Sequence, residues 1–209
     1  RENQFQLFLV YRFFAIWVYG FSAVGFFLLL SPLVELYVGA DRVLATSIIA
    51  WYLTDYFFKG ERVVLSNFKT AAGVFEQDKY LSILQGIVNL VLSIALVFKI
   101  GLAGVFIGTV LSGLIANITK PIIIYRVCFE KSAISYFQES IKYLLVIGAA
   151  LAVLIPLQNL LMPQVTIAKF ALMIVIITVV FNGIFLVVFG RTEEFKYLYG
   201  MVKGRWKRS

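Results

Sequence analysis

The sequence has no histidine, a single cysteine (Cys128) and only 14% charged residues. Without histidine there is no imidazole for acid–base catalysis and no His/Cys metal site. A lone cysteine excludes an internal disulfide, and no charge pattern around Cys128 would activate its thiol. We therefore expect a protein that is not an enzyme and that binds neither a metal nor a cofactor.

Apolar residues take the place of the missing polar ones. They make up 61% of the chain, and the mean hydropathy is +0.92, whereas soluble domains are about 45–50% apolar and about 25% charged. Six apolar runs approach or exceed the ~18–20 residues that cross a ~30 Å hydrocarbon layer. These runs are too long for strands and do not alternate, so we predict an all-α integral membrane protein with six transmembrane helices. The predicted helices are 13–38, 43–65, 80–100, 101–119, 143–161 and 170–190, in a bundle over 1–190 with a basic cytoplasmic tail over 191–209.

Proline and glycine mark the expected ends of these helices. Pro32 and Gly39 are expected to end the first helix, and Pro121 to bend or end the fourth. Lys99-Ile100-Gly101 is expected to form a tight turn between the third and fourth helices. Gly104 and Gly108 form a small-xxx-small pattern, which predicts close packing of the fourth helix against a neighbour.

Positive charge is divided unequally between the two sides of the predicted membrane. Arg42, Lys99 and Lys169 fall on one side, and all other Lys and Arg residues fall on the opposite side. Because cytoplasmic loops retain positive charge, we expect both ends of this chain in the cytoplasm. The basic residues are spread over several loops rather than gathered in one stripe, so nucleic acid is not an expected partner. The basic tail is interpreted as an anchor on anionic membrane lipids.

The second predicted helix and its continuation carry polar groups on one face, with Lys59 and Arg62 expected near the inner membrane boundary and Lys69 beyond it. They are spaced by four, three, four and three residues, and they are Asp55, Lys59, Arg62, Ser66 and Lys69. This face is either a cationic strip at the mouth of a cavity, with Asp55 paired to Lys59, or topogenic charge that reaches the membrane interface. Lys120 and Arg126, on either side of Pro121, mark either a hinge beside an anion site or an ordinary helix end. A coupling-ion role for Asp55 or Glu35 is a further possibility.

The third predicted helix carries an uncharged polar stripe of Ser82, Gln85, Asn89 and Ser93. Such a stripe either lines a hydrated path or holds the bundle together by hydrogen bonds between helices. The last two helices have only scattered polar residues, among them Gln158 and Asn159, and are interpreted as peripheral and lipid-facing.

Several short motifs, in order, resemble the carboxy-terminal part of bacterial polysaccharide flippases, which belong to the MOP (multidrug/oligosaccharidyl-lipid/polysaccharide) exporter superfamily. The main ones are Asn89-Leu-Val-Leu-Ser-Ile94, Lys99-Ile-Gly101-Leu-Ala-Gly104-Val-Phe-Ile-Gly108-Thr-Val-Leu-Ser112, Lys120-Pro121 and Tyr125-Arg126. Further matches are Pro32-Leu-Val-Glu-Leu-Tyr-Val-Gly39, Phe68-Lys69-x-Ala71-x-Gly73 and Asp78-Lys79-Tyr80.

This resemblance implies the carboxy-terminal lobe of a two-lobe transporter in the bacterial cytoplasmic membrane, without its amino-terminal lobe. The implied activity is to flip undecaprenyl-pyrophosphate-linked oligosaccharide to the outer leaflet for capsule, exopolysaccharide or O-antigen synthesis. Its partners would be the lipid-linked oligosaccharide, membrane lipids, a polysaccharide polymerase and glycosyltransferases. A cationic face would attract the pyrophosphate, and it comprises Lys59, Arg62, Lys69, Lys120 and Arg126. The cavity would be lined by Asp55, Gln85, Asn89 and Ser93.

Three other functions are weighed against this one. A cation-coupled drug or metabolite exporter of the same superfamily would need an essential carboxylate in its cavity, for which Asp55 is the candidate. A membrane-embedded polymerase or acyltransferase would need catalytic groups on an outer loop, where only Asp41, Arg42 and Lys99 are present. A noncatalytic membrane scaffold is the third alternative, and only an activity assay excludes it.

Overall fold

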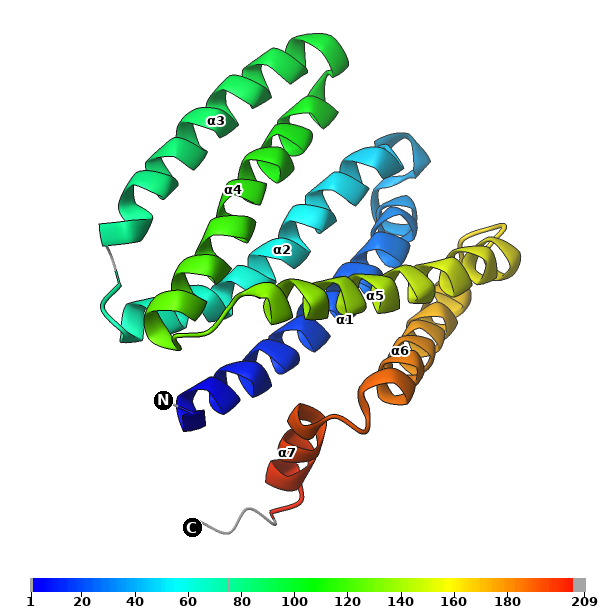
Figure 1. Cartoon of the computed structure of the whole chain (residues 1–209). Coiled ribbons are helices and arrows are strands. Elements are labelled where there is room, and N and C mark those ends of the chain that lie inside the picture. Colours follow the sequence, from blue (N-terminus) through cyan, green and yellow to red (C-terminus); the bar gives the residue numbers. More distant parts are fainter. Residues whose placement is uncertain (1, 75, 205–209) are drawn as a thin grey trace.

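The computed structural model describes residues 2–74 and 76–204, and all regular structure in this part of the chain is helical. The elements are α1 (Glu2–Val38), the 3-10 turn η1 (Ala40–Arg42), α2 (Thr46–Ala71), α3 (Glu76–Ile100), α4 (Leu102–Cys128), α5 (Ile134–Leu161), α6 (Ile167–Phe189) and α7 (Glu193–Val202). The six long helices run up and down, so both ends of the chain lie at the same end of the bundle (Figure 1).

The order of the helices in space differs from their order in the chain. α3 packs against α4, α4 against α2, and α2 against α1, while α5 and α6 pack against α1 and each other (Figure 1). α3 is therefore an edge helix, and its side chains Ile83, Ile87 and Leu90 are more than half exposed. Lipid is the solvent in which so much exposed apolar surface is stable.

Five helices in the described part of the chain are long and apolar enough to cross a membrane: α1, α3, α4, α5 and α6. This is the architecture of an all-α, multi-pass membrane protein. The sequence predicted six such helices. The remaining one, α2, has 26 residues but carries Asp55, Lys59, Glu61 and Arg62 in its middle. It lies between α1 and α4, where protein rather than lipid surrounds most of its charges.

Most helices extend beyond the predicted ranges. α1 begins at Glu2 rather than at residue 13, α4 continues to Cys128, and α5 begins at Ile134 rather than at residue 143. The predicted ranges followed apolar runs, whereas helical hydrogen bonds continue wherever charged side chains reach headgroups or partners. Residues 193–202 of the predicted tail form α7, and residues 205–209 lie outside the described residues.

Pro32 and Pro121 lie inside helices rather than at their ends. Pro32 has no N–H, so it leaves the carbonyl oxygen of Leu28, four residues earlier, without its helical partner. Gln158 of α5 replaces that partner by donating from Nε2 to Leu28 O at 2.5 Å. α1 therefore continues to Val38, and Gly39, with a φ of +107°, ends it.

Aromatic side chains fill two cores along α1. One joins α1 to α5 and α6, and it includes Phe13, Trp17, Tyr143, Phe185 and Phe189. The other joins the start of α1 to the ends of α2 and α4, and it includes Phe5, Phe8, Phe68, Tyr125 and Phe129. Arg12 lies on α1 where these two cores meet, so protein surrounds its side chain on every side.

α3 and α4 form a tight hairpin, because Gly101 alone separates them and adopts a φ of +66°. The two glycines of the small-residue pattern lie at the contact. A Cβ on Gly104 would lie 2.4 Å from the carbonyl carbon of Leu96, and one on Gly108 would lie 2.7 Å from Ser93 Oγ. Only glycine permits this approach of the two backbones.

We predict that Gly104→Ala destabilises the hairpin, because the added carbon meets backbone that cannot rotate away. The cost should be about 1–3 kcal/mol, as for other overpacked sites, which lowers the melting midpoint in detergent by several degrees. Unfolding can be followed by the reaction of Cys128 with a fluorogenic thiol reagent. Gly86→Ala is the matched control, since a Cβ there meets nothing within 4 Å. Equal midpoints for the two variants would contradict the close packing.

Candidate functional site

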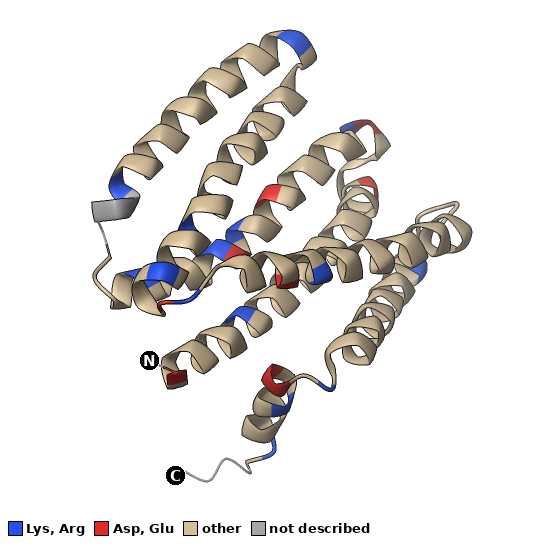
Figure 2. Cartoon of the chain, in the orientation of Figure 1, with Lys and Arg blue, Asp and Glu red and all other residues tan. Residues whose placement is uncertain are grey.

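Lys and Arg residues gather at the end of the bundle that holds both chain ends (Figure 2). The opposite end has Arg42 in η1, Lys99 at the end of α3 and Lys169 at the start of α6. Among the described basic residues, the three that the sequence set apart therefore lie at the end opposite to the one where most of the others gather. This asymmetry is the electrostatic setting of the charged clusters described next.

The first cluster, the α2–α4 cluster, consists of Asp55, Lys59, Arg62 and the carbonyl group of Gly113. Lys59 Nζ lies 2.6 Å from Asp55 Oδ2, and Arg62 Nη2 lies 3.5 Å from Asp55 Oδ1. Arg62 Nη1 also donates to Gly113 O of α4 at 3.0 Å. Asp55 is therefore shared between two cations that differ in exposure: the side chain of Lys59 is 60% exposed and that of Arg62 only 10%.

The direction of the predicted polar face follows from these contacts. Asp55 and Arg62 are buried against α4, while Lys59 points out of the protein. Gly113 makes room for the guanidinium, since a Cβ there would lie 3.0 Å from Arg62 Nη1. Arg62 was expected to bind phosphate, but its two terminal nitrogens are engaged inside the bundle. It acts here as a cross-link between α2 and α4.

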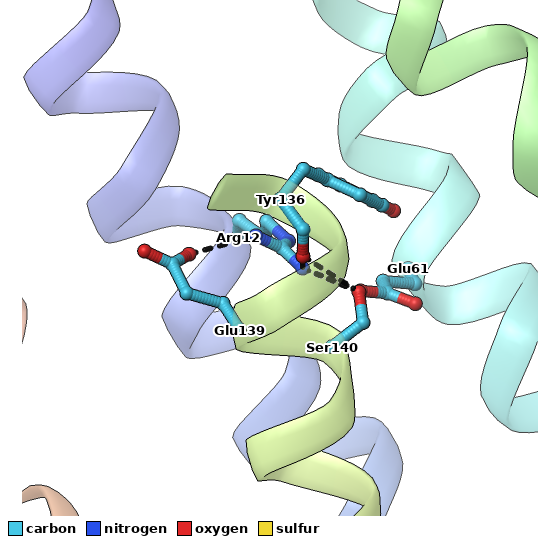
Figure 3. Close-up of polar contacts among 5 residues, drawn as sticks. All are labelled: Arg12, Glu61, Tyr136, Glu139 and Ser140. Carbon is cyan, nitrogen blue, oxygen red and sulfur yellow. Dashed lines mark hydrogen bonds and ion pairs between the residues drawn. The ribbon is translucent and has the colours of Figure 1, made fainter. Parts of the chain in front are cut away.

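The second cluster, the Arg12 cluster, joins three helices (Figure 3). Arg12 of α1 places Nη2 2.7 Å from Glu61 Oε1 of α2, and Nη1 2.8 Å from Glu139 Oε2 of α5. The guanidinium also donates to Tyr136 O at 2.9 Å and to Ser140 Oγ at 2.7 Å. Its carbon lies 3.6 Å from the centre of the Tyr136 ring. Arg12 is only 1% exposed, so these contacts replace the hydration of Nη1 and Nη2, whereas the buried Nε has no hydrogen-bond partner among the described residues.

The charges of the Arg12 cluster do not cancel, because one cation faces two carboxylates. Glu61 is 7% exposed and depends on Arg12 for compensation, whereas Glu139 is 36% exposed and reaches solvent. Removal of one member of a buried pair leaves the other charge unscreened, which costs about 3–5 kcal/mol. The Arg12 cluster therefore fixes the positions of α1, α2 and α5 relative to one another.

The two clusters meet at Glu61 and Arg62, which are consecutive in α2. Neighbouring side chains on a helix point about 100° apart, so Glu61 reaches α1 and α5 while Arg62 reaches α4. α2 is thus held on both sides by its charges. Gly60 gives the same region room for α1, since a Cβ there would lie 2.1 Å from the ring of Tyr19.

The other predicted cations do not form one continuous face. Lys69 and Lys120 are half-buried, and each engages a neighbouring group. Arg126 is exposed at the end of α4, where it lines a hollow of about 300 Å³ together with Lys131 and Ser132. Of the five predicted phosphate-binding residues, Lys59 and Arg126 are the exposed ones.

The polar stripe of α3 is half-buried at Gln85, Asn89 and Ser93. Ser93 Oγ donates to Asn89 Oδ1 at 2.9 Å and lies 3.4 Å from Val105 O of α4. For Ser93 these are the contacts of a residue that joins two helices rather than of one that lines a hydrated path.

Sequence reasoning missed Arg12, Glu61 and Glu139 as site residues. Arg12 was assigned to the cytoplasmic boundary, and the spacing pattern of α2 selected the face beside Glu61. The available signal was a carboxylate at position 61 between Lys59 and Arg62, deep in an apolar chain, because intramembrane charges usually have a partner. The sequence could not identify that partner, which comes from a helix 49 residues away.

Comparison with known proteins adds no relative: no family model, curated protein or solved structure matches the chain. Among the side chains that the structure describes, those of residues 2–74 and 79–204, no group of three or more His, Cys, Asp or Glu residues could hold a metal ion. The chemistry offered by the described site is therefore that of Lys, Arg and carboxylate groups in an apolar bundle.

We predict that Arg12→Met lowers the free energy of unfolding by about 3–5 kcal/mol, because Glu61 is left buried without its cation. The double variant Arg12→Met/Glu61→Met should lose much less, since no fully buried charge then remains unpaired. Denaturant unfolding in detergent measures both. Lys142→Met, which removes an exposed cation of α5, is the control and should be neutral. A double variant as unstable as the sum of its two single variants would contradict the pairing.

Proposed function

We propose that this chain is one lobe of a carrier that flips undecaprenyl-pyrophosphate-linked oligosaccharides across the bacterial cytoplasmic membrane. The observation that carries the proposal is Lys59, an exposed cation on a charged helix that the bundle holds among apolar neighbours. A pyrophosphate crossing a membrane needs a cation at depth, and placing one there costs several kcal/mol unless protein groups compensate it. The motif resemblance described above points to the same substrate.

The shared carboxylate suggests how Lys59 becomes available to substrate. When Lys59 turns toward a phosphate, Asp55 keeps Arg62 as its counter-ion, so no buried charge is left unpaired. Arg62 is then a positioning residue, and Lys59 is the residue that touches substrate. Arg126, exposed at the end of α4, supplies a second cation at the end where positive charge gathers (Figure 2).

The proposed orientation places this positive end in the cytoplasm, where the lipid-linked substrate is made. Both ends of the chain are then cytoplasmic, in line with the rule that positive loops stay inside. α2 lies between the α3–α4 hairpin and the group of α1, α5 and α6, and its two clusters touch both. Movement of α2 would therefore displace both groups of helices, which is compatible with alternating access.

We predict that Lys59→Gln/Arg126→Gln lowers polysaccharide export at least about tenfold, since a charge-assisted phosphate contact is worth about 1.5–3 kcal/mol. Export is measured as surface polysaccharide per unit of protein found in the membrane. Lys99→Gln, at the opposite end, should export normally. Wild-type export by the double variant at normal membrane abundance would contradict the proposal.

A cation-coupled exporter of the same superfamily is the second candidate, because Asp55 is a buried carboxylate in a helix packed between α1 and α4. The Asp55→Asn variant distinguishes the flippase function from the exporter function. The flippase proposal expects export per unit of protein in the membrane to persist, because Lys59 keeps its charge, while the amount of protein falls because Arg62 loses its counter-ion. The exporter expects loss of ion-driven dye efflux from membrane vesicles. Efflux that is present in the wild type and abolished by Asp55→Asn would favour the exporter.

A further inference from the structure

A polar pocket of about 390 Å³ lies at the end of the bundle opposite the chain ends. Its walls come from α1, α2 and α5. Its polar members are Ser31, Glu35, Thr46, Gln158 and Asn159, and Phe27 provides an aromatic wall. Two of these residues belong to α5, which the sequence indicated to be peripheral and lipid-facing.

The pocket forms around Pro32. Because this proline leaves Leu28 O without a helical donor, Gln158 is drawn to α1, and its amide is fixed by the bond to that oxygen. This bond holds the outer halves of α1 and α5 beside each other. The pocket is therefore shaped by a specific contact between the two helices. Pro32 and Leu28 themselves form part of the wall.

The polar side chains around the pocket lack partners in the structure. Among the described side chains of residues 2–74 and 79–204, no hydrogen bond or ion pair is made by the side chains of Ser31, Glu35, Thr46 and Asn159. Together they present a carboxylate, an amide and two hydroxyl groups toward one volume. Groups of this kind can be satisfied by water or by a ligand rich in hydroxyl groups.

The chemistry of the lining selects among ligands. No Lys or Arg lines the pocket, and Glu35 would repel a phosphate. The polar lining does not suit a lipid tail, which offers no hydrogen bonds. A sugar offers hydroxyl donors to a carboxylate, both donors and acceptors to an amide, and an apolar ring face to Phe27.

We propose that this pocket binds the glycan of the transported lipid on the outer side of the membrane. Arg12 and Glu35 are separated by about 35 Å along α1 at ~1.5 Å per residue, which exceeds the ~30 Å hydrocarbon thickness. The pocket is therefore a release-side site, remote from the Arg12 cluster. This inference rests on the proposed flippase function and adds a sugar site to it.

The test is protection of an introduced cysteine by substrate. In a Cys128→Ser background, Asn159→Cys is labelled from outside the cell with a membrane-impermeant maleimide. Labelling is compared between cells that make lipid-linked repeat units and cells in which the first glycosyltransferase is blocked. We expect substrate to slow the labelling at least threefold. Asp41→Cys, an exposed position in η1 at the same end, should label equally in both cells.

Two further measurements keep the outcomes distinct. Thr46→Cys provides a second reporter on another wall, and Glu35→Ala should reduce export at least threefold at normal membrane abundance. Equal labelling of both reporters in the two cell types, while Lys59→Gln/Arg126→Gln still blocks export, would overturn the sugar site and leave the flippase function intact. Labelling that responds to Na⁺ but not to glycan synthesis would also overturn it, by making the pocket a cation site.

Discussion

The buried contact of Arg12 with Glu61 is the constraint on which the arrangement of the bundle depends. A helix with four charges in its middle is unstable in lipid, so α2 can be embedded only where protein groups satisfy those charges. Arg12 satisfies Glu61 from α1 and draws in Glu139 and Ser140 of α5. On its other side, α2 is held to α4 through Arg62. The charged helix is thereby placed at the centre, with apolar helices around it.

In this arrangement, the charged side chains that hold helices together differ from the one that can contact a ligand. Arg12, Glu61 and Arg62 are buried and join helices through their contacts, whereas Lys59 is exposed and shares its carboxylate with Arg62. A cation of that kind can exchange its partner without exposing the protein to an unpaired charge. At the other end of the same helices, the polar pocket around Pro32 offers uncharged and acidic groups instead. Under the proposed function, the two ends would match the two chemical halves of the substrate, pyrophosphate and glycan.

Sequence reasoning succeeded where a local rule suffices. Long apolar runs predicted the helices, Gly101 the α3–α4 turn, and the four-residue spacing the pair of Asp55 with Lys59. Sequence reasoning failed where a residue far away in the chain determines which contact a side chain or carbonyl group makes. Whether Arg62 faced a cavity or a helix depended on Gly113, 51 residues away. Pro32 was expected to end α1 because nothing local shows that Gln158, 130 residues further along the chain, bonds to the freed carbonyl.

Leaflet transfer of the lipid-linked oligosaccharide tests the central claim most directly. Cells deprived of this protein are supplied with radiolabelled sugar, and the labelled lipid in each leaflet is distinguished by its access to a glycosidase added outside spheroplasts. If the chain is part of the flippase, labelled repeat units accumulate in the inner leaflet, where the added enzyme cannot reach them. Cleavage of the labelled lipid at the wild-type rate would contradict that role.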